Sequence, residues 1–202
     1  LIDLYGLLLS LWRFLSKRDI KEPYKVRIYN PDFEEHGWNS GLTVIEFVGP
    51  DKPFQIDTIQ ILLNRLDIGM HSMMHIGGAK IERDKKGNMI SFHDISEQID
   101  LPYQFESLAF FEVDRQKEED GSLEVLQEQI NDALEHVNLV VDDFEPMRVQ
   151  LTEAISGLSE NCPDKQCEDF SEAIAFLQWL RDRHFIFLGY CDLDIIQKTK
   201  KQ

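Results

Sequence analysis

The fold is decided by residues 42–66, which read LTVIEFVGPDKPFQIDTIQILLNRL. The first seven residues are rich in β-branched and aromatic side chains, and such a run predicts a strand. From Ile56 to Leu66 the apolar residues recur at spacings of three and four, which predicts an amphipathic helix. Asp51 is placed to cap this helix, and Pro53 suits its first turn. The stretch therefore predicts a strand, a short loop and a helix.

The segments that follow extend this unit. Residues 70–76 and 79–83 have extended patterns, a turn is expected at 84–88, and residues 89–92 return as the second arm of a hairpin. Another strand is expected at 107–114, and Ser122 can cap a long helix. This order is typical of an α+β fold, an antiparallel sheet with helices on one side, and resembles the ferredoxin-like βαββαβ arrangement. The last strand of that arrangement is not in its usual place. Either an early strand at 24–29 fills its position, or the pattern is decorated.

The rest of the chain predicts helices at both ends. Residues 1–18 form an amphipathic pattern, 32–40 a loop, and 141–158 a helical pattern in which Pro146 marks a kink or a fresh start. We expect four parts: an N-terminal helix at 1–23, an α+β domain at 24–158, a linker at 159–168, and a second domain begun at 169–202. That last part would hold a helix at 169–183 and a strand at 185–191. The chain begins with Leu1 and ends directly after this strand, so we expect a piece of a longer protein.

The composition excludes several classes of partner. The chain has 202 residues, 37 acidic against 21 basic, and a net charge of −16. A field of this sign repels phosphate backbones and anionic lipids, so neither nucleic acid nor a membrane surface is expected as a partner. No apolar run approaches the ~20 residues that cross a bilayer. The odd number of cysteines, Cys162, Cys167 and Cys191, indicates a reducing compartment, and we expect a cytoplasmic protein.

Motifs for catalysis and cofactors are missing from the sequence. Gly77-Gly78 opens no phosphate-binding turn, and Ser107 lacks the Gly-x-Ser-x-Gly context of a hydrolase nucleophile. His71 and His75 lie four apart, which on a helix would suit a metal ion, but this segment reads as a strand. A metal-dependent enzyme built on these histidines stays an alternative. We expect no catalytic, cofactor or metal site in this chain.

One loop is a candidate binding site. Gly49, Asp51, Lys52, Pro53 and Phe54 join the strand to the helix, and a helix N-terminus can hold a carboxylate through its dipole and its free N–H groups. The alternative is that Asp51 only caps its own helix.

Residues 44–63 resemble the opening of an ACT domain, whose loop typically reads Asp-x-Pro-Gly, with Phe54 here in place of the glycine. In that family the loop often binds an amino-acid effector at a domain interface.

A closer resemblance is to the amino-terminal region of the large bacterial NAD-dependent glutamate dehydrogenases. Their Asp-x-Pro-Phe-x-x-Asp-Ser/Thr pattern is matched from Asp51 to Thr58 and includes Asp57. A histidine followed by an Arg-Asp-x-x-Gly turn is matched by His75, Arg83, Asp84 and Gly87. The pattern Phe-x-Phe-Leu-Gly-Tyr is matched at 185–190, with Gly189 and Tyr190.

This resemblance implies a parent enzyme that deaminates glutamate with NAD, with its catalytic residues outside this chain. The chain itself would be a non-catalytic regulatory or oligomerisation region without a cofactor of its own. Its partners would be other domains or subunits of a homo-oligomer, and an amino-acid effector. The alternative is a stand-alone amino-acid-binding protein of the ACT class.

Overall fold

The computed structural model describes residues 2–19, 21–100, 102–161, 168–191 and 193. The chain divides into two compact units, residues 1–137 and 138–202. The first unit holds a five-stranded sheet, and the second holds helices. Among the described residues, no helix combines the length and the apolar composition that a membrane span requires.

The first unit is built on a sheet in the order β1-β2-β5-β3-β4, and every pair of neighbours is antiparallel. Its strands are β1 (Lys25–Tyr29), β2 (Thr43–Pro50), β3 (Met70–Arg83), β4 (Met89–His93) and β5 (Gln104–Val113). Because β2 and β3 are both antiparallel to β5, they run parallel to each other, and α3 (Gln55–Arg65) connects them. The ferredoxin-like class expected from the sequence is confirmed.

Both alternatives given for the last strand of the βαββαβ order are partly correct. β1 pairs with β2 along its whole length and so occupies the position that the last strand of a βαββαβ fold would take. β4 is an addition, since it pairs only with the last residues of β3. The N-terminal strand therefore completes the sheet, and the hairpin decorates it.

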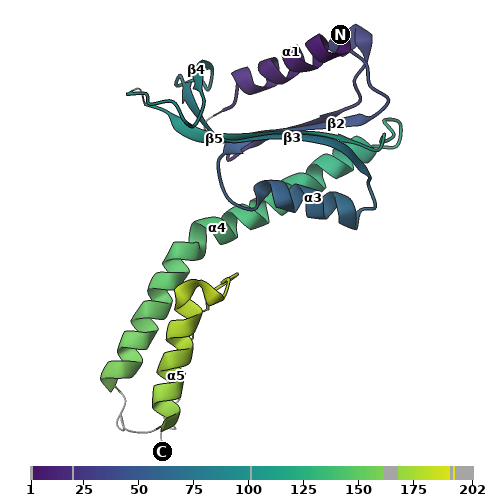
Figure 1. The fold of residues 1–202 in the computed structure, drawn as a ribbon. Coiled ribbons are helices and arrows are strands. Elements are labelled where there is room, and N and C mark those ends of the chain that lie inside the picture. Colours follow the sequence, from purple (N-terminus) through teal and green to yellow (C-terminus); the bar gives the residue numbers. More distant parts are fainter. Residues whose placement is uncertain (1, 20, 101, 162–167, 192, 194–202) are drawn as a thin grey trace, which may run out of the picture. The chain divides into compact units, whose positions relative to one another are not determined.

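Apolar side chains of the central strands alternate between two cores. Val44 and Val48 of β2 belong to a cluster with Leu11, Phe14 and Leu15 of α1 (Ile2–Ser16). The fully buried Ile45 and Phe47 point to the other side, where they meet residues of α3 and of α4 (Ser122–Asn161): Ile59, Leu63, Leu126, Ile130 and Leu134. Figure 1 shows α1 on one face of the sheet, with α3 and the start of α4 on the other. The flanking N-terminal helix thus covers the second face of the sheet.

Three local expectations were wrong. The loop after β1 contains a one-turn helix, α2 (Phe33–His36), which Asp32 caps by accepting from the N–H groups of Glu34 and Glu35. Asp51 does not cap α3, because α3 begins at Gln55 with Phe54 at its N-cap position. The fresh helix start at Pro146, one of the two alternatives given for this residue, is also wrong, since Pro146 lies inside the 40-residue α4.

The second unit contains the end of α4, then α5 (Glu168–Trp179) and a π-helical turn at Leu180–His184. Most of the expected linker, residues 162–167, lies outside the described residues, and α4 itself continues to Asn161. Residues 186–191 have no regular secondary structure, so the strand expected at 185–191 is wrong for the chain as described. A strand needs a neighbouring strand for its backbone hydrogen bonds. In this segment the side chain of Phe187 packs near α4, with its ring centroid 6.5 Å from that of Phe144.

Candidate effector-binding groove

The candidate loop lies between the end of β2 and the start of α3. Gly49 is the last residue but one of β2, and a Cβ added there would lie 2.9 Å from the Cβ of Tyr24, so this glycine serves packing. The backbone N–H of Asp51 donates to the carbonyl oxygen of Phe105 at 2.9 Å. This bond ties the loop to β5 and fixes the direction in which Lys52 and Pro53 leave the sheet.

Phe54 has a backbone conformation that favours glycine. Its φ angle is +68°, in the left-handed region, and its side chain is 53% exposed. This is the position at which the ACT pattern has glycine, so the turn keeps the geometry of that pattern with a different residue. A non-glycine residue in this region costs roughly 1–2 kcal/mol.

A groove of about 560 Å³ opens beside this loop. Its walls come from the loop, the first two turns of α3, the start of β3 and the middle of β5. The lining residues are Asp51, Lys52, Pro53, Phe54, Ile56, Asp57, Gln60, Met73, His75 and Ser107. The structure therefore brings the five-residue loop, apart from Gly49, together with two further residues of the glutamate dehydrogenase pattern, Asp57 and His75.

The polar groups of the groove carry charges of both signs. Asp51 and Asp57 offer carboxylates, and Lys52 offers an ammonium group. Asp51 reaches toward β3, because a Cβ added to Gly77 would lie 3.5 Å from its Oδ1 atom. The first intrahelical bond of α3 runs from the N–H of Thr58 to the carbonyl of Phe54, so earlier N–H groups, such as that of Ile56, have no acceptor inside the helix. The groove can receive a cationic group at its carboxylates and an anionic group at the helix end.

β3 and β5 form the wall of the groove that the sequence did not predict. The Nε2 atom of His75 and the hydroxyl of Ser107 share a hydrogen bond of 2.9 Å. The side-chain amide of Gln60 donates to the sulfur of Met73 at 2.9 Å. In the sequence Ser107 lacks the context of a hydrolase nucleophile, and Met73 has no pattern that indicates a function. Their place in the groove follows from the pairing of two strands far apart in the chain.

His71 and His75 have different hydrogen-bond partners. His71 bonds through Nε2 to the Oδ1 atom of Asp114 at 2.7 Å, whereas His75 bonds to Ser107. The hydrogen bond from His71, and a second from the N–H of Gly69, hold the pKa of Asp114 below its ordinary value. Over the described residues, no three His, Cys, Asp or Glu side chains are close enough together to hold a metal ion.

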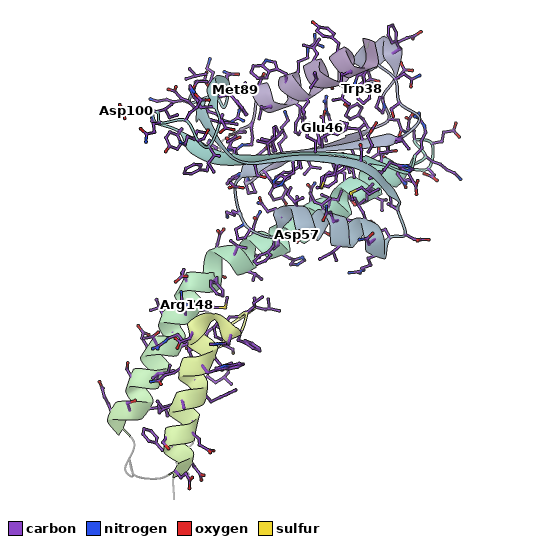
Figure 2. The ribbon with its side chains drawn as sticks, in the orientation of Figure 1. Trp38, Glu46, Asp57, Met89, Asp100 and Arg148 are labelled. Atoms are coloured by element: carbon purple, nitrogen blue, oxygen red, sulfur yellow. The ribbon has the colours of Figure 1, made fainter. Side chains whose placement is uncertain are left out.

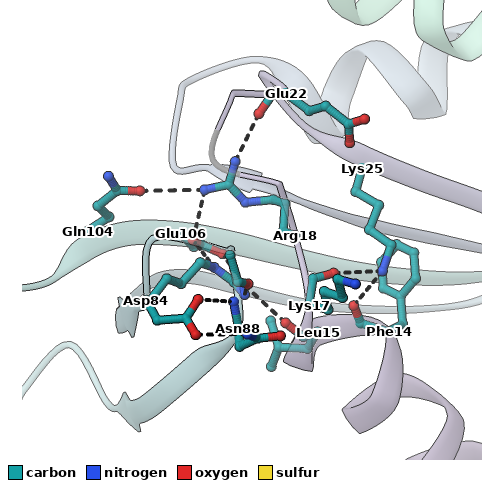
Figure 3. A network of polar contacts seen from close by, with 12 residues as sticks. Phe14, Leu15, Lys17, Arg18, Glu22, Lys25, Asp84, Asn88, Gln104 and Glu106 are labelled. Atoms are coloured by element: carbon teal, nitrogen blue, oxygen red, sulfur yellow. Dashed lines mark hydrogen bonds and ion pairs between the residues drawn. The ribbon is translucent and has the colours of Figure 1, made fainter.

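The Arg-Asp-x-x-Gly turn holds the α1 helix on the sheet (Figure 3). Arg83 donates from Nε and Nη2 to the two carboxylate oxygens of Glu106, both at 2.7 Å, and Arg18 adds a third bond at 2.9 Å. Nη2 of Arg83 also donates to the carbonyl of Leu15, 3.1 Å away in α1. The Glu106 side chain is fully buried. Burial raises the pKa of a carboxyl, but the bonds from Arg83 and Arg18 outweigh it and hold the pKa of Glu106 below its ordinary value.

Asp84 and Gly87 shape this turn. The Asp84 carboxylate accepts from the N–H groups of Lys86 and Asn88 at 2.8 and 2.9 Å. Gly87 has φ +81°, and a Cβ there would lie 1.9 Å from the carbonyl oxygen of Arg18. Its own carbonyl accepts from the N–H of Arg18 at 3.0 Å. Only glycine fits this contact, so these pattern residues are structural and lie outside the groove.

A second buried carboxylate, Glu46, also lies between α1 and the sheet (Figure 2). It accepts from Nε of Arg27 at 2.7 Å and from the Tyr29 hydroxyl at 3.3 Å. Burial raises the pKa of Glu46, and Arg27 offsets only part of that rise. Burial, followed by the nearby Glu46 carboxylate, raises the pKa of Tyr29 to about 12. Glu46 was not predicted as a site residue, although a glutamate inside an apolar strand is the kind of signal that indicates a buried ion pair.

The remaining pattern residues, Gly189 and Tyr190, belong to the second unit. With Leu188 they line a cavity of about 290 Å³ against α4, where Met147 and Pro146 lie opposite. Cys191 is a free, exposed cysteine. Cys162 and Cys167 lie outside the described residues.

The strand order and the loop between β2 and α3 together define an ACT-like domain of the ferredoxin-like class, with α1 added on the second face of its sheet. The chain belongs to the family described as the glutamate dehydrogenase ACT1 domain, which it matches over residues 1–130. This matched range includes α1 and all five strands.

Two relatives extend the similarity beyond the ACT1 region. The chain is 38% identical over 201 residues to the NAD-specific glutamate dehydrogenase of Halomonas elongata, and 36% identical over 199 residues to that of Pseudomonas aeruginosa. These alignments cover 99% and 98% of this chain but only 12% of each relative. The chain therefore corresponds to a small part of a much longer kind of protein.

Proposed function

We propose that this chain is the amino-terminal regulatory and assembly region of an NAD-dependent glutamate dehydrogenase. Its parent would convert L-glutamate, NAD and water to 2-oxoglutarate, ammonium and NADH, with the NAD site and the catalytic residues elsewhere in the polypeptide. The observation that carries the proposal is the similarity to two NAD-specific glutamate dehydrogenases over almost the whole chain. The protein would act in the cytoplasm, and its partners would be other domains of the same enzyme. The residues after about 168 would begin a second ACT-like domain.

Regulation would work through the groove beside the β2–α3 loop, with an amino acid as effector. The Asp51 and Asp57 carboxylates suit an α-ammonium group, and the N-terminus of α3, with Lys52 nearby, suits an α-carboxylate. Pro53, Phe54 and Met73 offer an apolar wall for the effector's side chain. An amino acid carries its ammonium and carboxylate groups on the same carbon atom. This spacing fits a groove in which carboxylates and positively polarised groups lie close together.

Isothermal titration with a panel of amino acids tests this sensing role. We expect heat from at least one amino acid, and a loss of that heat in Asp57→Asn, which keeps the size of the side chain and removes its charge. The matched control is Glu128→Gln, an exposed acid on α4 outside the groove. If no amino acid gives heat, sensing is refuted and the assembly role remains. Equal binding by Asp57→Asn and the control would refute the groove as the site.

The second candidate is a stand-alone amino-acid-binding protein of the ACT class. The groove supports it equally well, but relatives about eight times longer than the aligned region argue against it. Sequencing the reading frame beyond Gln202 separates the two proposals. A downstream glutamate dehydrogenase domain supports the first, and a stop codon directly after Gln202 supports the second.

A further inference from the structure

The side of α1 that faces away from the sheet carries an apolar stripe. Its members are large side chains that are each more than half exposed: Leu4, Tyr5, Leu8 and Trp12. Residues four apart lie nearly above one another on a helix, so these side chains form one row with Tyr5 beside it, here called the outer stripe. No charged residue occurs from Leu4 to Trp12. The sheet-facing side of α1 is apolar as well, and a helix that is apolar all round is typically buried on all sides.

The outer stripe cannot turn toward the sheet, because α1 is fixed along its whole length. Near the start of the helix, a Cβ added to Gly6 would overlap the Cβ of Trp38, so the helix backbone lies directly on this side chain. In the middle, the hydroxyls of Ser10 and Tyr29 share a hydrogen bond of 3.1 Å. At the end, the arginine hydrogen bonds of Figure 3 hold the last turn. Among the described residues of the first unit, no element covers the outer stripe, which is therefore open to another part of the protein.

The size of the outer stripe separates a tethered partner from an independent molecule. Four half-exposed side chains present roughly a few hundred Å², which is the size of functional patches on single chains. A stable interface between separate chains buries about 800 Å² on each partner. Two copies of this chain also repel each other, since each has a net charge of −16. A segment of the same polypeptide needs less contact area, because its tether provides a high effective concentration. The outer stripe therefore suits a tethered, uncharged partner.

The relatives indicate where such a partner can come from. This chain covers only 12% of each of them, so a protein of their length has ample sequence outside these residues. We propose that the outer stripe of α1 is a docking surface for an apolar helix from the part of the parent polypeptide that follows residue 202. Side chains four residues apart form a ridge, and such a ridge packs into the groove of a second helix. This contact makes α1 a middle layer between the sheet and the rest of the enzyme. The inference rests on the proposed function, because it requires the parent polypeptide.

Thiol labelling of the full-length enzyme tests this docking surface. Leu8→Cys is compared in the full-length enzyme and in the 202-residue chain, after the three native cysteines of this chain have been replaced by serine. N-ethylmaleimide, followed by peptide mass spectrometry, should modify Leu8→Cys at least about tenfold more slowly in the full-length enzyme, because docking buries this position. The matched control is Val125→Cys on α4, where the side chain is 52% exposed against 51% at Leu8, and its rate should be equal in both samples. Trp12→Cys, in the same stripe, replaces Leu8→Cys if circular dichroism shows that the latter does not fold.

A cross-link identifies what covers the outer stripe. Benzophenone maleimide on Leu8→Cys should join the stripe to a peptide beyond residue 202, in a product with the mass of one polypeptide. A product with the mass of two polypeptides, or protection that already occurs in the 202-residue chain, means that another copy covers the stripe and overturns the inference. Equal labelling of Leu8→Cys in the two samples overturns it as well.

An assay of NAD-dependent glutamate oxidation on the same full-length sample separates this inference from the proposed function. An active enzyme whose outer stripe is labelled freely refutes the docking surface alone. A protected stripe in a polypeptide without this activity refutes the proposed function and leaves the docking surface.

Discussion

Replacing Arg83 with methionine should destabilise the sheet unit strongly, because it leaves a buried carboxylate with a single partner. Glu106 is fully buried, and Arg83 supplies two of its three arginine hydrogen bonds, both at 2.7 Å. Removing one partner of a buried ion pair costs about 3–5 kcal/mol. Because Arg18 still donates one hydrogen bond to Glu106, we expect Arg83→Met to lower the free energy of unfolding by about 3 kcal/mol, toward the lower end of that range. Urea unfolding followed by circular dichroism measures the change, with Arg115→Met as the control.

The control arginine forms an exposed pair with Glu118 at 3.9 Å, so its loss should change stability by less than about 1 kcal/mol. Adding Glu106→Gln to Arg83→Met should recover part of the loss, since the buried charge is then removed. A cost below about 1 kcal/mol for Arg83→Met, or no recovery in the double variant, would refute the view that Glu106 is held ionised by Arg83.

The effect of Arg83→Met should also depend on pH. The pKa of Glu106 in the folded chain lies below its ordinary value of 4.5, so the ion pair stabilises the fold above about pH 4.5. That stabilisation is lost as the pH falls through the folded-state pKa. Without Arg83, burial favours the neutral acid, which makes the ionised form costly at neutral pH. The difference between the two chains should therefore shrink as the pH falls from 7 toward 4, and a constant difference would contradict the assignment.

Three further predictions concern the same unit. The folded-state pKa of Glu46 lies above its ordinary value, so the free energy of unfolding should decline as the pH rises from 4.5 through that pKa. Urea titrations at several pH values should show this decline in the unaltered chain and not in Glu46→Gln. Phe54→Gly should leave stability unchanged or raise it by up to about 1 kcal/mol, because it relieves the left-handed backbone, whereas Ile61→Gly, inside α3 and 66% exposed, should cost about 1 kcal/mol in thermal unfolding. Gly87→Ala should lower the free energy of unfolding by more than about 2 kcal/mol, because the new Cβ would overlap the carbonyl of Arg18. Gly121→Ala has a similar φ of +76° but its nearest atom lies at 3.9 Å, so it should cost only about 1 kcal/mol. Equal costs in the two variants would show that the backbone angle alone decides the effect.

The main elements of the sheet unit could be predicted because their patterns are local. The apolar alternation of β2, the spacing along α3 and the turn at 84–88 each depend on residues within a few positions of one another. The position of β1 could not be settled, because a five-residue strand looks the same beside β2 as at any other edge. The expected strand at 185–191 was wrong because β-propensity describes side chains, whereas a strand also needs a neighbour.

The candidate groove was predictable only in part. The loop and Asp57 follow one another in the chain, so their closeness could be expected. His75 and Ser107 are 32 residues apart, and only the pairing of β3 with β5 brings them together. The start of α3 was misplaced because the capping rule takes Asp51 as the natural cap and does not foresee a phenylalanine in a left-handed conformation.

The position of β1 at the start of the chain has a consequence for synthesis. All five strands lie within residues 25–113, so a chain leaving the ribosome holds every strand of its sheet before any residue of α4 has been made. In a fold whose last strand follows the second helix, the sheet would wait for that helix. Here both edge strands, β1 and β4, emerge before α4, which arrives later to cover an exposed apolar face. We expect that face, with Ile45, Phe47 and Phe111, to be the part of the nascent chain most in need of protection until Leu134 has emerged.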